Sequence, residues 1–165
     1  MGTSERILWD MRFSWSLARL RSTNNTISTI SHHILTSSAT LPISRTISII
    51  CPALPWRLTV PAKREVWEAY VTVQEVLEAL DQYLHTSVTT TELTSICAGQ
   101  SQLLQSILSA RTNRLLVSAG QAVPGGGGEV LRVDVLLGDT TFAGLKPLAN
   151  NEHFILELTP TYVDY

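Results

Sequence analysis

The four histidines are the first candidates for chemistry, because imidazole is a common metal ligand and a common general base. His32 and His33 are adjacent, so they diverge in a strand and point about 100° apart in a helix, and neither geometry suits two ligands of one metal. His85 and His153 have no acidic or thiol partner at ligand spacing. We therefore expect no metal site, and no cofactor.

Nucleophilic catalysis has little support in the sequence. A serine nucleophile would need a shaped turn such as Gly-x-Ser-x-Gly, and the chain has none. A thiol triad of Cys51, His153 and Asp134 can be drawn, because triads need not be local in sequence. Many such triples can be drawn from any chain, so we assign no catalytic residue and favour a protein that is not an enzyme.

Aromatic and charged residues are better candidates for a binding surface. Trp15 falls in a weakly patterned segment, where a large apolar ring is either covered by loop or exposed to a partner. Asp10 and Asp134 have a structural alternative, which is to bond turn amides or to pair with a neighbouring arginine. The candidate binding residues are Trp9, Asp10, Trp15, Trp67, Arg132 and Asp134.

The chain is poor in charge. Charged residues make up 16% and the net charge is −2, against a usual charged fraction of about 25%. A surface of this kind opposes self-association only weakly. We therefore expect another protein, or a second copy of the chain in a homodimer, as the partner.

Charge and hydropathy patterns argue against other partners. The basic residues are interspersed with acidic ones, whereas nucleic-acid binding needs a concentrated basic stripe. No window approaches the roughly 18 apolar residues of a membrane span, and the N-terminus lacks the pattern of a signal peptide. We expect an intracellular protein, cytoplasmic or nuclear, that binds neither nucleic acid nor membrane.

Two helices are predicted from their capping boxes. Thr72 and Glu75 have the spacing of such a box, and an apolar stripe follows, which predicts a helix over 73–85. A second box at Thr89 and Glu92 opens a helix that runs to about Arg111 and is interrupted by Gly99.

Strands are predicted on both sides of these helices. Alternation over 46–50 and 56–60 indicates a hairpin or tight arch, and Pro52 and Pro55 shape its connection. Residues 13–44 are expected as a long loop-like segment, and 120–129 as a flexible glycine-rich turn without the spacing of a phosphate loop. The other predicted strands cover 6–10, 130–137, 140–142 and 153–158.

The order of these elements predicts one domain over 1–165 of the α+β class. We expect two layers, with a mixed or antiparallel sheet of four to five strands and two helices on one face. A strand pair followed by a helix and then further strands is compatible with a β-grasp (ubiquitin-like) arrangement, in which the second helix would be extra.

Six short motifs in a fixed order resemble a known family. They are Leu8-Trp-Asp10, Ala39-Thr40 with Pro42, Pro52-Ala-Leu-Pro-Trp56, Val71-Thr-Val73 with Val76-Leu77, Arg132-Val-Asp134 and Phe142-Ala-Gly-Leu145. So arranged over residues 7–158, they resemble an uncharacterised domain family abundant in basidiomycete fungi. The resemblance implies a fungal, intracellular, single-domain protein and supplies no catalytic residues. Residues 22–38 depart most from its pattern.

Three functional hypotheses follow. The leading one is a non-catalytic protein-interaction module. The alternative is a small-ligand-binding protein or enzyme whose pocket lies between the 13–44 segment and the sheet. A third is a degenerate gene copy in which residues 16–38 have drifted.

Overall fold

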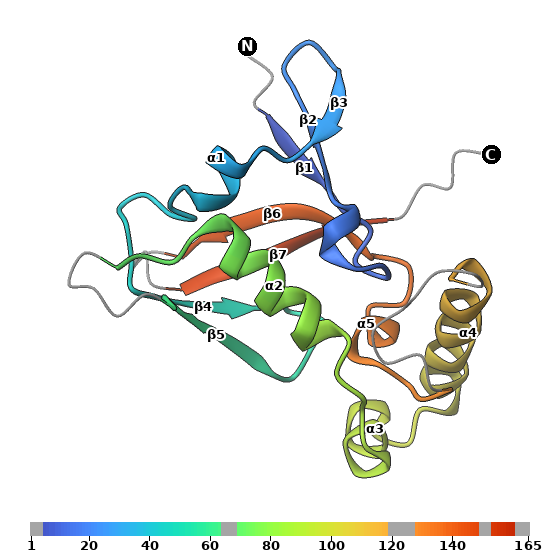
Figure 1. The fold of residues 1–165 in the computed structure, drawn as a ribbon. Coiled ribbons are helices and arrows are strands. Elements are labelled where there is room, and N and C mark those ends of the chain that lie inside the picture. Colours follow the sequence, from blue (N-terminus) through green and yellow to red (C-terminus); the bar gives the residue numbers. More distant parts are fainter. Residues whose placement is uncertain (1–4, 64–68, 119–127, 149–152, 161–165) are drawn as a thin grey trace.

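The computed structural model describes residues 5–63, 69–118, 128–148 and 153–160 (Figure 1). Trp67 and residues 120–127 of the predicted 120–129 turn lie outside the described residues. The strands are β1 Arg6–Leu8, β2 Arg19–Arg21, β3 Ile27–Thr29, β4 Thr46–Ile50, β5 Arg57–Pro61, β6 Thr141–Pro147 and β7 His153–Thr159. The helices are the 3-10 turn η1 Trp15–Leu17, α1 His32–Thr36, α2 Val73–Leu84, α3 Thr90–Cys97, α4 Ser101–Val117 and α5 Arg132–Val135.

The central element is a four-stranded mixed sheet in the order β5-β4-β7-β6. β4 and β5 form the predicted antiparallel hairpin, β7 lies parallel to β4, and β6 is antiparallel to β7. Alternation along β4 buries Ile47 and Ile49. A hairpin, then a helix, then a final strand parallel to the first is the β-grasp arrangement. The α+β class and the mixed sheet are therefore confirmed.

Helix α2 crosses one face of this sheet, and it has the predicted bounds to within one residue (Figure 1). Thr72 accepts from the amide of Glu75, and the Glu75 carboxylate accepts from the amide of Thr72, which completes the capping box. The apolar stripe places Leu77, Leu80 and Leu84 in the core. Local capping and tertiary burial agree here, which is why the sequence prediction succeeds.

The second predicted helix is two helices, and it does not pack on the sheet. Ala98 and Gly99 have φ of 44° and 80°, so the chain leaves α3 in the left-handed region and turns before α4. α4 then packs against α5, and α3 and α4 lie beyond the end of the sheet (Figure 1). The expectation of two helices on one face is corrected accordingly.

The predicted strand over 130–137 is also wrong. Arg132–Val135 is the short helix α5, and the carboxylate of Asp134 accepts from the amide of Leu131 at 2.9 Å at its start. Leu137 then has a left-handed φ of 61°. Leu131, Val133 and Val135 are buried and alternate with Arg132 and Asp134, which is the spacing of a half-buried strand, and a helix of four residues is too short to show the helical period.

Residues 13–44 contain regular structure where a long loop was expected. They hold η1, β2, β3 and α1, and β1-β2-β3 form a separate antiparallel sheet. Each of these strands is three residues long, which is too short for alternation to be recognised. β1 lies beside β6, and Asp10 bridges to Thr141.

One buried cluster connects these parts. It includes Trp9 before η1, Ile47 of β4, Leu77 of α2, Ile107 of α4 and Phe154 of β7. Among the described helices, none is both long and apolar enough to cross a membrane.

Candidate functional site

Strand β5 lies at the edge of the four-stranded sheet, with β4 on one side only. The amide of Ala62, just beyond β5, donates to the carbonyl of Arg45 at 2.8 Å. Since alternate residues of an antiparallel strand face the partner strand, Arg57, Thr59 and Pro61 direct their backbone groups away from β4. Among the described residues, no strand pairs with their carbonyls or with the amides of Arg57 and Thr59. These groups form the free edge of β5, which Pro61 shortens because it has no N–H.

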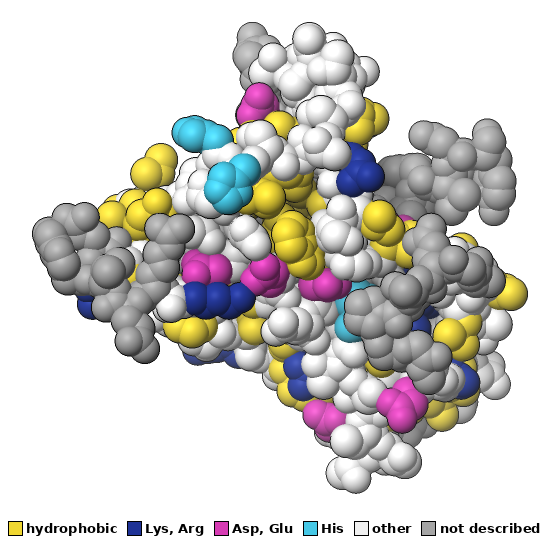
Figure 2. Space-filling view, in the orientation of Figure 1, with side chains coloured by type: hydrophobic (Ala, Val, Ile, Leu, Met, Phe, Trp, Pro, Cys, Tyr) yellow, Lys and Arg dark blue, Asp and Glu magenta, His cyan; other side chains and the backbone are white. Residues whose placement is uncertain are grey.

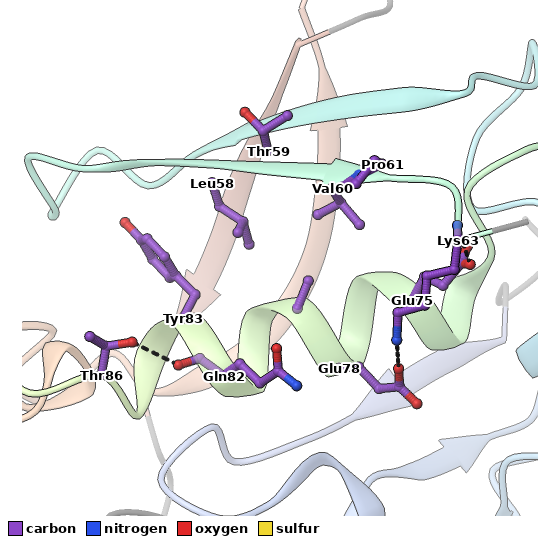
Figure 3. A pocket seen from close by; sticks show the side chains of 11 residues that line it. Leu58, Thr59, Val60, Pro61, Lys63, Glu75, Glu78, Gln82, Tyr83 and Thr86 are labelled. Carbon is purple, nitrogen blue, oxygen red and sulfur yellow. Dashed lines mark hydrogen bonds and ion pairs between the residues drawn. The ribbon is translucent and has the colours of Figure 1, made fainter. Parts of the chain in front are cut away.

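A groove runs between this edge strand and helix α2 (Figure 3). Leu58 and Val60 point from β5 toward the helix, whereas Thr59 points to the opposite face. Ala79 and Tyr83 of α2 line the other side, and the volume is about 400 Å³. An apolar floor beside unpaired backbone groups suits a peptide side chain better than a charged substrate.

One end of the groove is closed by charged residues. Lys63, after β5, pairs with Glu78 of α2. The Lys63 amide donates to Glu75 at 2.9 Å, and that carboxylate also caps α2. Burial acts to raise the pKa of Glu75, but the hydrogen bonds from Thr72 and Lys63 outweigh it and hold the pKa below its usual value. The ionised carboxylate thus fixes the strand to the helix.

The other end of the groove is aromatic. The Tyr83 hydroxyl donates to the carbonyl of Trp56 at 2.8 Å, and burial raises the pKa of Tyr83 to about 12. The guanidinium carbon of Arg132 lies 4.5 Å from the centroid of the Trp56 ring and 4.7 Å from that of Tyr83. The Trp56 indole donates to Glu92 at 3.0 Å. A cation is thus held against two aromatic rings where the groove ends.

Of the candidate binding residues that the structure describes, none lines this groove, but Arg132 contacts Tyr83, which does. Asp134 is two residues away but faces a different partner: its carboxylate accepts from Arg114 Nε at 2.7 Å and from Arg114 Nη2 at 3.0 Å. Arg114 is 0% exposed and Asp134 is buried with it. Asp134 therefore has the structural role of joining α5 to α4.

The remaining candidates do not converge on the groove. Trp9 is 2% exposed, and its indole donates to the carbonyl of Phe13 at 2.9 Å. Asp10 holds Arg12 in a bidentate pair with a shortest distance of 2.6 Å. Trp15 is half-buried and packs against the core cluster, and Trp67 lies outside the described residues.

The sequence contained one signal for the groove that our reading missed. Pro61 ends an alternating strand, and proline within a sheet is confined to edge strands, strand starts and bulges. That rule identifies β5 as an edge strand. It does not reveal which helix face lies opposite Leu58 and Val60.

Other features offer less. A cavity of about 520 Å³ lies between β1, α2 and β6, and includes Ile7, Val76 and Phe142 in its lining. Another, of about 350 Å³, lies between α3 and α4 beside Cys97. In the part of the chain that the structure describes, no group of three or more His, Cys, Asp or Glu residues could hold a metal ion.

Surface charge is mixed on the face of the molecule seen in Figure 2, with positive, negative and apolar side chains interspersed among the described residues. The comparison with protein families gives one match: the model described as "Family of unknown function (DUF6699)" matches residues 7–153. No curated protein and no solved structure matches the chain significantly.

Proposed function

The chain belongs to the DUF6699 family of unknown function, and we propose that it is a non-catalytic protein-interaction module that binds an extended segment of a partner protein along β5. The observation that carries this proposal is the free edge of β5 beside an apolar groove. From the order of the six sequence motifs, we also propose a basidiomycete origin and an intracellular location.

Binding would proceed by strand addition, in which main-chain hydrogen bonds give affinity and side-chain pockets give selectivity. The outward amide of Thr59 and the outward carbonyls of β5 supply the main-chain groups. Alternate side chains of the added strand point toward α2 and enter the space between Leu58, Val60 and Ala79.

The test begins with a phage-displayed library of random peptides, selected on the whole protein. Thr59→Pro removes the outward amide, and it introduces proline at a position equivalent in orientation to Pro61. We expect Thr59→Pro to weaken the binding of the selected synthetic peptides about tenfold, because it removes one hydrogen bond and adds a steric conflict. Fluorescence anisotropy measures the affinity.

The matched control is Thr59→Val, which keeps the amide and changes only the outer side chain. Its affinity should stay within about twofold of the wild type. A second variant, Ala79→Leu, fills the groove and leaves the edge intact, so it should also weaken binding. Selection of no peptide, or equal binding by wild type, Thr59→Pro and Ala79→Leu, would reject the proposal.

The same edge offers a route to a homodimer, in which β5 of one copy pairs with β5 of another. Sedimentation separates this possibility from peptide binding. A dimer that becomes monomeric in Thr59→Pro but not in Thr59→Val would make a second copy the occupant of the edge.

The alternative function is binding of a small ligand. The cavity between β1, α2 and β6 is the place where such a ligand would bind. Apolar Ile7, Val76 and Phe142 line it together with the charged Arg6 and Glu157. Thermal shift with a panel of small amphipathic metabolites tests this alternative. Stabilisation lost on Val76→Trp but kept in Ala79→Leu would favour the cavity over the groove.

A further inference from the structure

Arg132 lies next to the groove, in contact with Tyr83. Tyr83 lines the groove, and the guanidinium carbon of Arg132 lies 4.7 Å from the centroid of its ring. Trp56 directly precedes β5, so the second ring in contact with Arg132 lies where the edge strand begins. A segment added along β5 would therefore pass this cation at the Arg57 end of the strand.

The charge of Arg132 is not neutralised as that of Arg114 is. In the described part of the chain, the side chain of Arg132 makes cation–π contacts but no hydrogen bond or ion pair, and its Nε is buried without a partner. Arg114 instead has a bidentate carboxylate. A guanidinium held by two rings, yet without an acidic partner, is preorganised for an arriving anion.

The carboxylate of Glu92, near Arg132, is already engaged. Glu92 accepts from the Trp56 indole through Oε1, and from the Thr89 amide and hydroxyl through Oε2. The pKa of Glu92 is lowered mainly by its hydrogen bonds with Thr89, and the nearby charge of Arg132 also contributes. Arg57, at the start of β5, alternates with Leu58 as Thr59 does, so its side chain points to the opposite face and does not add to the charge beside Arg132.

Arg132 is also open to a partner. The residue as a whole is half-buried, and the enclosed unpartnered atom is Nε rather than either Nη. Rings cover the faces of a stacked guanidinium and leave its edge, which is the direction of its N–H bonds. Carboxylates bind such an edge with short, charge-assisted hydrogen bonds.

We infer that the segment bound along β5 carries an aspartate or glutamate, whose carboxylate binds the edge of Arg132. This inference rests on the proposed binding at β5. Because alternate residues of a strand share a face, the acidic residue lies two positions from the apolar residue that enters the groove beside Leu58 and Val60. The partner is thus an extended acidic segment of another protein.

A double-mutant cycle between peptide and protein tests the inference. In a peptide selected from the random library, glutamate is replaced by glutamine, and affinities are measured for the wild type and Arg132→Gln. We expect replacement of the peptide glutamate to weaken the affinity for the wild type about tenfold and to leave the affinity for Arg132→Gln unchanged. Lys63→Gln, at the opposite end of the groove, is the control and should keep the full cost.

Loss of the folded state in Arg132→Gln would not end the test, since Arg132→Lys retains the charge but not the planar fork. Arg132→Lys should keep part of the preference for glutamate. The glutamate-to-glutamine comparison on the wild type needs no protein variant at all. The effect of the glutamate on affinity should also shrink as salt concentration rises.

The outcomes separate this inference from the proposed function. Selected peptides without acidic residues, or a glutamate preference unchanged in Arg132→Gln, would overturn the role of Arg132 and leave strand addition in place. Equal binding by the wild type and both groove variants, Thr59→Pro and Ala79→Leu, would instead reject binding at β5 and this inference with it.

Discussion

Arg114 and Asp134 show how a single pair determines local structure. The guanidinium is fully buried, both of its bonds to Asp134 are short, and its Nη2 also donates to the carbonyl of Glu129 at 3.0 Å. Removing one member of a buried pair leaves the other charge without compensation, which is costlier than replacing both. The pair therefore constrains the α4–α5 contact strongly.

We predict that Arg114→Met lowers the free energy of unfolding by about 3–5 kcal/mol. The double variant Arg114→Met with Asp134→Asn should recover part of this loss, since the asparagine is neutral and can still accept from the Leu131 amide. Urea denaturation measures both. A double variant less stable than Arg114→Met alone would contradict this account of the pair.

His85 is a second residue with a measurable role. Its Nδ1 lies 2.8 Å from the carbonyl and 3.0 Å from the carboxylate of Asp81, and its Nε2 lies 3.3 Å from the carbonyl of Arg12. Burial acts to lower the pKa of His85, but these acceptors outweigh it and raise the pKa above its ordinary value. The ring thus links the end of α2 to the turn after β1.

A raised pKa gives stability that is full below the unfolded-state pKa of about 6.5 and is lost as pH rises through the folded-state value. We predict that the melting temperature of the wild type exceeds that of His85→Gln most near pH 5.5, about one unit below that value, and that the gap shrinks toward pH 8.5, about two units above it. Differential scanning calorimetry measures this difference in melting temperature. A gap that widens with pH would show that His85 acts as a neutral residue.

At the scale of elements, the two capping boxes differ in context. Thr72 and Glu75 are buried, and Glu75 also binds the amide of Lys63. Thr89 and Glu92 make the same reciprocal bonds at the exposed start of α3. The first box therefore supports one wall of the groove, whereas the second supports a helix at the periphery.

We predict that Thr72→Ala destabilises the protein by about 1–2 kcal/mol, and Thr89→Ala by less, about 0.5 kcal/mol. Thr72→Ser retains the hydroxyl and is the control for the first change. Thermal or urea unfolding measures all three. Equal losses at the two positions would show that burial of the first box adds nothing to its strength.

Elements also show where local patterns predict structure and where they fail. Helix α2 has a cap, a stripe of apolar residues and a sheet to cover, so local and tertiary preferences coincide. In α5 the buried residues Val133 and Val135 alternate with Arg132 and Asp134, as in a strand. A helix of four residues is too short to show the period on which a helix prediction depends.

At the scale of the whole molecule, the β-grasp order explains why the groove exists. β4 and β7 occupy the centre of the sheet, so β5 is left at an edge, and α2 crosses the face close enough to β5 to form a second wall. Edge strands invite pairing with another chain, and proteins often limit it with proline. Pro61 shortens this edge without removing the Thr59 amide.

The candidate site was only partly accessible from sequence. Arg132 was identified as a candidate binding residue and as a neighbour that Asp134 could pair with, but Asp134 pairs with Arg114 instead. Tyr83 and Trp56, the aromatic contacts of Arg132, come from segments 49 and 76 residues earlier in the chain, respectively. Spacing along a sequence carries no information about contacts over such separations.

The sequence by itself determined the α+β class, the β4–β5 hairpin and helix α2, because alternation, helical spacing and capping boxes are local properties of neighbouring residues. Only the tertiary structure decided which strand lies at the edge, that Asp134 binds Arg114, and that Arg132 lies beside two rings at the end of a groove. Those features depend on long-range packing, in which one residue's surroundings are supplied by distant parts of the chain.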